Sequence, residues 1–252
     1  MTGGSALLSR LPGASLLDLE VVEAFALTPS MRRIRFGGPS LAGLEHAPGQ
    51  DLMFSVPAGG GRAFRRRYTI RRFDPAALLL DVDVVLHGDG PGATWAAGVR
   101  PGERVEAIGP RGKILLHSEA RWHLFTAEES AIPATFAMVE ALGPGSRAIV
   151  LLEVGDPVDE QPIEVHPGCD LQLAWLHRSG AEPGRSGVLV DAVASVEIPE
   201  GRGHAYLNGE LKVVDELRRV LLGRGLPAED LSVKPYWRLG VANAPHGEPA
   251  RT

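Results

Sequence analysis

The sequence predicts a two-domain protein in which an antiparallel β-barrel precedes a doubly wound α/β domain. Short runs of alternating apolar and polar residues fill residues 18–118, separated by glycine and proline, and such a series is typical of a barrel or sandwich. From Arg121 onward, apolar strands alternate with helical segments, which favours a parallel sheet with helices on its faces. The pattern changes near residues 117–120, where we expect the domain boundary.

Several segments of the first part show the two-residue period of a strand with one buried face. These expected strands cover residues 17–25, 31–36, 52–56, 78–86 and 105–108. A further segment, residues 64–70, has an apolar and aromatic centre flanked by arginines. Asp81 and Asp83 are two residues apart, so they are expected on one face of their strand.

Apolar strands and two helices are expected in the second part of the chain. The strands cover residues 122–126, 148–154, 171–176 and 205–207. The first helix, residues 132–142, has Pro133 in its first turn, where the missing N–H group costs little. The second helix, residues 210–222, has an apolar face formed by Val213, Val214, Leu217, Val220 and Leu221.

The chain ends and the composition limit the classes of function. Residues 1–17 and 241–252 are expected to be flexible, which leaves a barrel domain at 18–118 and an α/β domain at 119–240. The net charge of −5 argues against general nucleic-acid binding. No apolar run approaches the ~20 residues of a membrane helix, and no signal peptide is evident. We therefore expect a cytoplasmic protein without membrane insertion, acting as a monomer.

Cysteine usage excludes some kinds of site. Cys169 is the single cysteine, so a disulfide within the chain and a cysteine-based zinc or iron–sulfur site are excluded. No base is evident beside this thiol, and an incidental thiol is favoured over a nucleophile. No metal site is expected.

The arginine-rich segment at residues 64–72 is the first candidate for chemistry. Five arginines, Arg65, Arg66, Arg67, Arg71 and Arg72, flank its apolar and aromatic centre. Arginine forks suit phosphate or carboxylate. Charge alone favours the alternative, a strand with a solvated basic face.

A glycine-rich turn at residues 86–96 is the second candidate. A strand is expected to lead into this turn and a short helix to follow it. Free backbone N–H groups at a helix N-terminus form an anion site, and glycine lets the backbone approach a phosphate closely. Taken alone, such turns are usually structural, and no Gly-Lys-Ser/Thr follows to make it a P-loop.

Together these segments resemble the flavin site of the ferredoxin-reductase-like superfamily, and more closely that of the siderophore-interacting, ferric-siderophore-reductase family. Six stretches carry the resemblance in family order, between about Asp18 and Gly240. They are residues 66–71; 85–96; 101–103 with 109–112; 159–163; 175–178; and 236–238. The resemblance implies an FAD-binding barrel followed by a nicotinamide-binding α/β domain.

The resemblance also assigns residues to FAD, which the family binds non-covalently. Arg66 is expected to bind the pyrophosphate, and Tyr68 and Thr69, followed by Ile70, to lie against the isoalloxazine. The pyrophosphate loop is expected to be shaped by His87, Gly88, Gly90, Ala93, Thr94 and Trp95.

The second domain departs from the family pattern where the nicotinamide is expected to bind. The family segment resembles Gly-Asp-Glu-Thr-Ala-Leu-Pro-Ala, whereas residues 127–134 are Ala-Glu-Glu-Ser-Ala-Ile-Pro-Ala. Glu129 and Ser130 remain candidates for the donor site, and loss of the loop glycine could restrict the approach of a cofactor. Arg178 follows an expected strand and could pair with the 2′-phosphate of NADPH, or it is a surface arginine; NADH and NADPH both stay open.

Other residues are assigned to the flavin and the substrate by the same resemblance. Tyr236 and Trp237 follow the last expected strand and either cover the isoalloxazine or pack as core aromatics. Basic residues of the family's groove bind anionic ferric siderophores, and Lys212, Lys234 and Arg238 are the candidates here. Solvated surface side chains are the alternative for the lysines.

The resemblance implies a reductase in which NADPH or NADH gives a hydride to FAD, and electrons then pass singly to a ferric siderophore. Ferrous iron binds hard oxygen ligands more weakly, so the metal is released. No catalytic acid or base of the protein is required. The alternatives are a biosynthetic flavoenzyme of the same fold, a ferredoxin donor, and a non-enzymatic siderophore- or flavin-binding protein.

Overall fold

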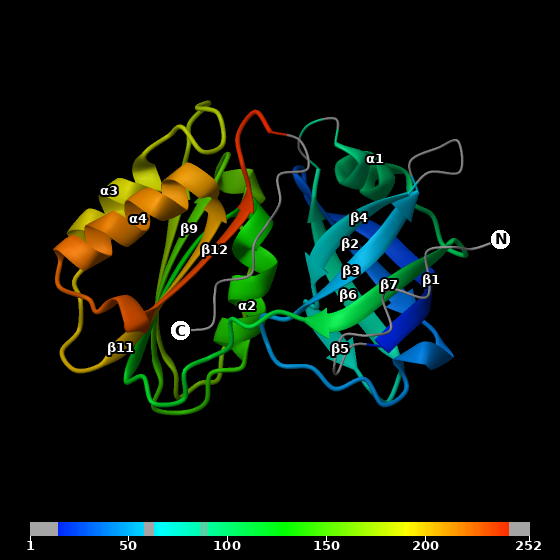
Figure 1. Cartoon of the computed structure of the whole chain (residues 1–252), viewed down its shortest axis with the longest axis horizontal. Helices are drawn as coiled ribbons and strands as arrows, with labels where there is room; N and C mark the ends of the chain where they lie inside the picture. Colours follow the sequence, from blue (N-terminus) through cyan, green and yellow to red (C-terminus); the bar gives the residue numbers. More distant parts are fainter. Residues whose placement is uncertain (1–14, 58–62, 87, 89, 242–252) are drawn as a thin grey trace. The chain divides into compact units, whose positions relative to one another are not determined.

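The computed structural model describes residues 15–57, 63–86, 88 and 90–241 (Figure 1). The chain divides into two compact units, Met1–Leu115 and Leu116–Thr252. Most of the two predicted flexible ends, 1–17 and 241–252, lies outside the described residues. No helix in the described part of the chain is long and apolar enough to cross a membrane.

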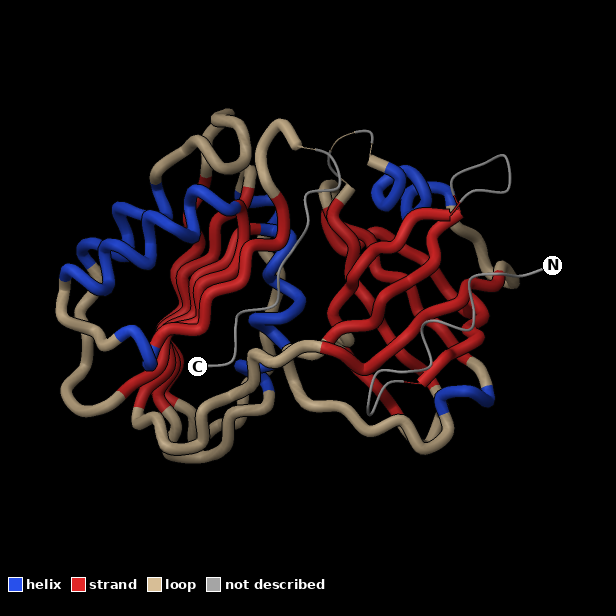
Figure 2. The backbone as a smooth tube through the Cα atoms, viewed as in Figure 1, coloured by secondary structure: helices blue, strands red, loops and turns tan. Residues whose placement is uncertain are grey.

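The first unit contains one antiparallel sheet that curls into a half-barrel (Figure 2). Its strands are β1 (Ser15–Thr28), β2 (Met31–Gly37), β3 (Asp51–Pro57), β4 (Ala63–Thr69), β5 (Arg72–Asp74), β6 (Leu79–Val85) and β7 (Arg104–Arg111). They lie in the order β4-β3-β7-β1-β2-β6-β5. Each strand predicted from the two-residue period is present, because its apolar residues face the core enclosed by the sheet. The prediction of an antiparallel barrel domain is confirmed.

The second unit contains a parallel sheet whose strand order defines a switch point. Its strands are β8 (Trp122–Glu128), β9 (Arg147–Val154), β10 (Asp170–His177), β11 (Gly203–Glu210) and β12 (Leu231–Trp237). The order β10-β9-β8-β11-β12 is that of a doubly wound sheet. The chain reverses direction across the sheet between β8 and β11, and ligands of such sheets bind at the carboxyl ends of the strands there.

Helices cover both faces of this parallel sheet. Figure 1 shows α3 (Val188–Ser195) and α4 (Leu211–Gly223) side by side on one face and α2 (Ile132–Glu140) on the other. Val214, Leu217 and Leu221 of α4 are fully buried, so the predicted apolar face is confirmed. The short helix α3 was missed, because its valines have low helix propensity and its helical state depends on packing against α4 and β9.

A cluster of histidines lies at the amino ends of β8 and β11. The rings of His117 and His204 stack with centroids 3.6 Å apart. The His123 Nδ1 atom lies 3.3 Å from the hydroxyl of Tyr206, and the His204 Nε2 atom lies 2.8 Å from the hydroxyl of Ser232. Burial, and then the charge of His117, lower the pKa of His123 and of His204 to about 4. Both imidazoles are therefore neutral in the folded protein at neutral pH.

This cluster predicts acid sensitivity. Because the pKa values of His123 and His204 are lower in the folded chain than the ordinary value of 6.5, the unfolded chain takes up protons first as the pH falls. The contribution of these two histidines to the free energy of unfolding is therefore complete above pH 6.5 and is lost as the pH falls from 6.5 to 4. Between about pH 7 and about pH 5 the expected loss is about 2 kcal/mol for each histidine.

Urea unfolding at a series of pH values measures this loss. The variants His123→Gln and His204→Gln should each flatten the pH dependence, whereas His166→Gln, at an exposed histidine, should leave it unchanged. Equal slopes for wild type and the two cluster variants would contradict the assignment.

Candidate functional site

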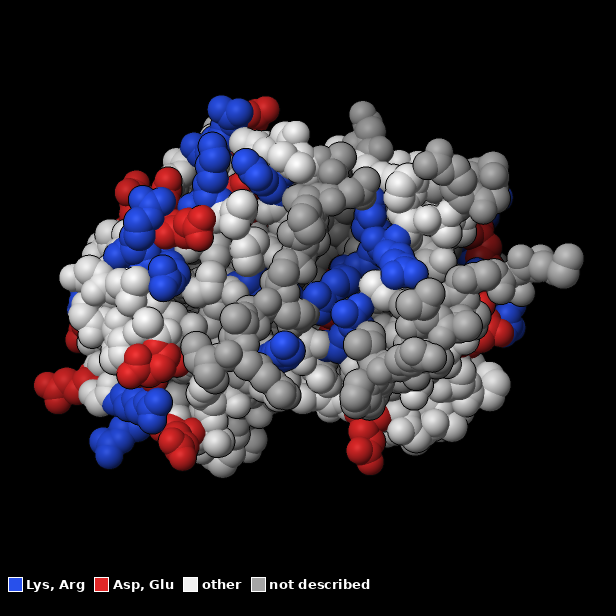
Figure 3. All heavy atoms as spheres, in the orientation of Figure 1, with Lys and Arg blue, Asp and Glu red and all other residues white. Residues whose placement is uncertain are grey.

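Strand β4 sends its arginines to opposite faces of the sheet. Arg66 pairs in register with Phe54, and Tyr68 with Leu52, on β3. Phe54 and Leu52 are fully buried, so Arg66 and Tyr68 start from the core side of the sheet. Arg65 alternates to the other side and is exposed. In the space-filling view, Lys and Arg side chains gather over the region of β4 (Figure 3).

Arg67 and Arg71 of segment 64–72 are paired with aspartates. Arg67 donates to both oxygens of Asp51, at 2.8 and 2.6 Å. The Nε atom of Arg71 lies 3.8 Å from Asp83 Oδ2, and both of these side chains are almost fully buried. The positive charges of Arg67 and Arg71 are therefore balanced within the sheet.

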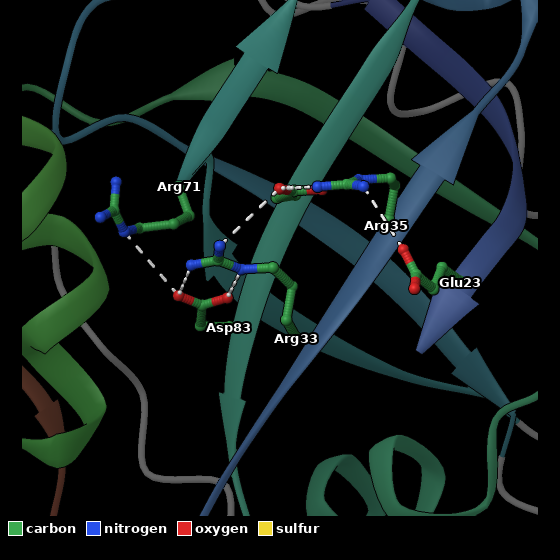
Figure 4. Close-up of polar contacts among 6 residues, drawn as sticks. Glu23, Arg33, Arg35, Arg71 and Asp83 are labelled. Atoms are coloured by element: carbon green, nitrogen blue, oxygen red, sulfur yellow. Dashed lines mark hydrogen bonds and ion pairs between the residues drawn. The ribbon is translucent and has the colours of Figure 1, made fainter. Parts of the chain in front are cut away.

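Arg71 is held at the end of an ion-pair ladder across β2 and β6 (Figure 4). Arg33 donates to both oxygens of Asp83, at 2.7 and 2.8 Å, and Arg35 to both oxygens of Asp81, at 2.8 and 3.0 Å. Both pairs are direct cross-strand neighbours. The expected placement of Asp81 and Asp83 on one strand face is confirmed, and the ladder shows why: each aspartate faces an arginine.

The glycine-rich turn leads into helix α1 (Pro91–Gly98), whose N-terminus is capped by no side chain of the described residues. The first bond within the helix runs from the Thr94 N–H to the Gly90 carbonyl, at 3.0 Å, so the N–H groups of Gly92 and Ala93 have no partner inside the helix. Gly88 has a φ of +67°, a conformation that glycine adopts without strain. The predicted site residue His87 lies outside the described residues.

Gly92 brings the start of α1 into contact with β4. A Cβ atom at this position would lie 2.4 Å from the Tyr68 hydroxyl and 3.4 Å from Cγ of Arg66. Only glycine therefore fits between the helix and these two side chains. The start of α1 therefore lies against the aliphatic stem of Arg66, whose guanidinium donates to the Arg65 carbonyl at 2.8 Å and lies 5.4 Å from the centroid of the Phe64 ring. A helix N-terminus and an arginine both favour an anion.

Aromatic packing fixes the position of Tyr68. Its ring stacks on Trp95 of α1 with centroids 6.0 Å apart and an interplanar angle of 20°. Trp95 also packs against Phe54, with ring centroids 6.2 Å apart, and is only 8% exposed. Its role is therefore to pack α1 against the sheet. Burial raises the pKa of the Tyr68 phenol, which stays neutral.

The other predicted flavin residues divide into buried and exposed positions. Thr69 and Ile70 are buried, and Ile70 belongs to the hydrophobic core. Thr94 is exposed on α1, and Ala93 is half-buried. The arrangement of Arg66, Gly92 and the uncapped helix end fits the diphosphate of FAD, with an aromatic ring, Tyr68, next to it.

In the second unit, Glu128 connects the ends of strands that flank the switch point. It accepts hydrogen bonds from the Ser130 hydroxyl, from the Ser130 N–H at 3.1 Å and from Trp237 Nε1 at 3.1 Å. Gly209 of β11 has a φ of +144°, and a Cβ there would lie 3.1 Å from Cγ of Glu128. Burial raises the pKa of Glu128 to about 7.

Arg178 lies just beyond β10 and is bound by two carboxylates. It donates to both oxygens of Glu129, in one case at 2.7 Å, and its Nη1 atom lies 3.6 Å from Glu153 Oε1. All three side chains are almost fully buried. Glu153 was not among the expected site residues, although the sequence contains a signal: it is a charged residue inside an otherwise apolar strand, residues 148–154.

The predicted substrate residues differ in exposure. Lys212 is exposed in the first turn of α4, and Arg238 is exposed after β12. Lys234 is 8% exposed, with its Nζ atom 5.4 Å from the centroid of the Tyr236 ring. Tyr236 and Trp237 are half-buried and belong to the end of β12 rather than following it.

Ala127, which stands where the family has a loop glycine, is a buried strand residue of β8. Among the described residues, no group of three or more His, Cys, Asp or Glu side chains is arranged to hold a metal ion.

A curled antiparallel sheet followed by a parallel α/β sheet is the architecture of the ferredoxin-reductase-like flavoproteins, and this chain has that fold. Residues 120–240 match the siderophore-interacting protein family, and residues 49–114 match the siderophore-interacting FAD-binding domain. The chain belongs to the siderophore-interacting protein family.

Individual relatives agree with this assignment. A siderophore utilization protein from T. fusca has 34% sequence identity and a TM-score of 0.83, covering 93% of this chain and 97% of that one. The ferric vibriobactin reductase ViuB of Vibrio cholerae is 34% identical, covering 69% of this chain and 65% of the relative. The NADPH-dependent ferric-chelate reductase of Escherichia coli is 24% identical, covering 87% of this chain and 92% of the relative. This chain spans about 65% of the length of the first curated relatives that it matches.

The contact between Gly92 and Tyr68 predicts that Gly92→Ala weakens FAD binding. The added methyl group overpacks the contact, at a cost of about 1–3 kcal/mol, and pushes the helix end away from Arg66. We expect a dissociation constant for FAD at least about tenfold higher, measured by flavin fluorescence.

Gly98→Ala, at the other end of α1, is the matched control, because its Cβ meets nothing within 4 Å. The double variant Gly92→Ala/Tyr68→Phe removes the clashing oxygen and should recover the melting temperature lost in Gly92→Ala. Normal FAD affinity in Gly92→Ala would show that α1 does not hold the diphosphate.

The raised pKa of Glu128 predicts a pH-dependent stability. Its folded value of about 7 exceeds the ordinary 4.5, so its contribution is complete below pH 4.5 and is lost as the pH rises through 7. Relative to Glu128→Gln, which stays neutral, the wild type should lose roughly 2 kcal/mol between about pH 5 and about pH 8.

Chemical unfolding of both proteins measures the difference, and the emission of Trp237 should titrate near pH 7 in the wild type only. Asp215→Asn, at an exposed position of α4, serves as the control. A difference that stays constant with pH would mean that the carboxyl group is ionised throughout.

Proposed function

We propose that this protein is an FAD-dependent reductase that passes electrons from a nicotinamide dinucleotide to ferric siderophores. The observation that carries the proposal is the meeting of Arg66, Tyr68 and the uncapped end of α1 at Gly92, in a chain of the siderophore-interacting family. The names of two relatives, a ferric vibriobactin reductase and a ferric-chelate reductase, support the same activity.

In this proposal the first unit binds FAD without a covalent bond. Arg66 and the N–H groups of Gly92 and Ala93 hold the diphosphate, and Tyr68 supports the ring system. Bound FAD supplies two-electron acceptance from a nicotinamide and one-electron donation to iron. The stacking of Tyr68 on Trp95 fixes the ring in one orientation.

The second unit binds the nicotinamide donor at the carboxyl ends of its strands. Parallel sheets of this order bind dinucleotides at the switch point, here between β8 and β11. Glu128 positions Trp237 by accepting its indole N–H. No side chain is required as a general acid or base.

The substrate is a ferric siderophore, bound by positive charge. Lys212 and Arg238 are exposed cations near the carboxyl ends of β11 and β12. An anionic chelate is attracted by such side chains. Because the proposed donor is a nicotinamide dinucleotide, we place the reaction in the cytoplasm. We also expect the protein to act as a monomer.

The test is an anaerobic absorbance experiment with FAD-loaded protein. NADH or NADPH should bleach the flavin, and a ferric hydroxamate or catecholate siderophore should restore its colour while an Fe(II) chelator traps iron. Arg66→Ala should weaken FAD binding by about tenfold or more, the effect of losing a charged hydrogen bond of about 1.5–3 kcal/mol.

Arg65→Ala is the matched control, because Arg65 precedes Arg66 on β4 and alternates to the other face. Bleaching without trapped Fe(II) would favour a different oxidant. Flavin that neither nucleotide reduces would exclude the nicotinamide donor and turn attention to ferredoxin.

A further inference from the structure

Residues 177–185, the last residue of β10 and the segment after it, carry three basic side chains, and each is paired with a carboxylate. Arg178 is bound by Glu129 and Glu153. His177 Nε2 lies 2.8 Å from Glu160, and Arg185 Nε lies 2.9 Å from Glu182. The structure describes all of residues 177–185, so every basic group in this segment has an acidic partner.

Arg178 is held back from solvent as well as neutralised. Its side chain is 7% exposed, and its Nε atom is buried without a hydrogen-bond partner. Gly155 lies against the pair: a Cβ there would be 3.5 Å from Nη2 of Arg178 and 3.1 Å from Asp159. The guanidinium fork is therefore turned inward, and its Nη groups are directed at Glu129 and Glu153.

The position of this cluster in the fold bears on the choice between NADH and NADPH. In doubly wound sheets the adenosine end of a dinucleotide lies at the carboxyl edge, where an acidic side chain accepts from the ribose 2′-hydroxyl of NAD and an arginine accommodates the 2′-phosphate of NADP. Glu153, Arg178 and Glu128 stand at the ends of β9, β10 and β8. An arginine, Arg178, is present at this edge, but its guanidinium is already bound by Glu129 and Glu153.

We propose that this edge selects NADH over NADPH, because Glu129 and Glu153 hold Arg178 away from a 2′-phosphate and add negative charge of their own. The inference rests on the proposed use of a nicotinamide donor and goes beyond it by naming the donor. A 2′-phosphate placed here meets carboxylates instead of an available cation, and like charges at short range repel. The 2′-hydroxyl of NADH has no such penalty.

The cluster also identifies the residue that sets the preference. Glu129 makes the bidentate contact, whereas Glu153 makes a single longer one. Replacing Glu129 by glutamine removes one negative charge and loosens the arginine, so the guanidinium becomes available to a phosphate. The change should act on nucleotide binding and not on the limiting rate of flavin reduction.

The experiment compares ADP-ribose with 2′-phospho-ADP-ribose by calorimetric titration into the FAD-loaded full-length protein. These fragments report the adenosine end of the site without any redox reaction. We expect the wild type to bind ADP-ribose at least about tenfold more tightly, and Glu129→Gln to gain about tenfold for the phosphorylated fragment, one charged hydrogen bond of about 1.4 kcal/mol. Affinity for ADP-ribose should be unchanged.

Glu216→Gln is the control for net charge, since Glu216 is exposed on α4 and outside the cluster. If Glu129→Gln does not fold, Glu153→Gln gives a second test, because it removes the other carboxylate bound to Arg178 and should raise affinity for the phosphorylated fragment by a smaller factor. Rates of anaerobic flavin reduction at several concentrations of NADH and of NADPH give an independent ranking.

Each outcome decides a separate claim. Equal or tighter binding of 2′-phospho-ADP-ribose by the wild type, with faster reduction by low NADPH, overturns the inference and leaves the proposed reductase intact. An equal gain in Glu216→Gln overturns the role of Glu129. If neither fragment binds and neither donor reduces the flavin, the nicotinamide part of the proposed function fails, and the inference fails with it.

Discussion

The pairing of arginines with buried carboxylates determines where this protein keeps its positive charge. In the first unit, Asp81 and Asp83 hold Arg33 and Arg35 across β2 and β6, and Asp51 holds Arg67. In the second, Glu129 and Glu153 hold Arg178. A bidentate arginine–carboxylate pair fixes both side chains in one geometry, which a lysine would not do. The paired arginines are therefore not available to bind an anionic ligand.

The pleat of β4 and the missing side chain of Gly92 build the flavin site that we propose. Alternation along the strand sends Arg66 and Tyr68 to the side of the buried core, while Arg65 and Arg67 turn away. The start of α1 can then reach both inward residues, because Gly92 has no side chain to separate them. The start of α1 and the side-chain stem of Arg66 are thereby neighbours. A helix N-terminus alone, or an arginine alone, would be a weak anion site.

Local patterns in the sequence were sufficient for most strands, for α4 and for the short helix α1, because each depends on the spacing of neighbouring residues. The strands β5 and β12 were not among those expected. Helix α3 was missed, since Val188, Val190 and Val193 disfavour a helix and tertiary packing supplies its stability. The pairing of Arg178 was also invisible: Glu129 lies 49 residues away in the chain, and only the parallel order of β8, β9 and β10 brings the partners together. A resemblance to a family can assign Arg178 to an edge, but it does not reveal which charges surround it.

The energetics of the carboxyl edge argue that its carboxylates serve selectivity rather than stability. Burial raises the pKa of Glu153, so the folded chain holds this carboxylate in its ionised form only at a cost in free energy. Buried ion pairs contribute little net stability compared with apolar packing, and breaking one partner away leaves an uncompensated charge. Hydrophobic side chains at Glu129, Glu153 and Arg178 would pack β8, β9 and β10 without that cost, but they would leave the edge indifferent to the charge of a ligand. A fixed set of carboxylates with one inward-turned arginine makes the edge discriminate between a hydroxyl and a phosphate, because the penalty falls on only one of the two.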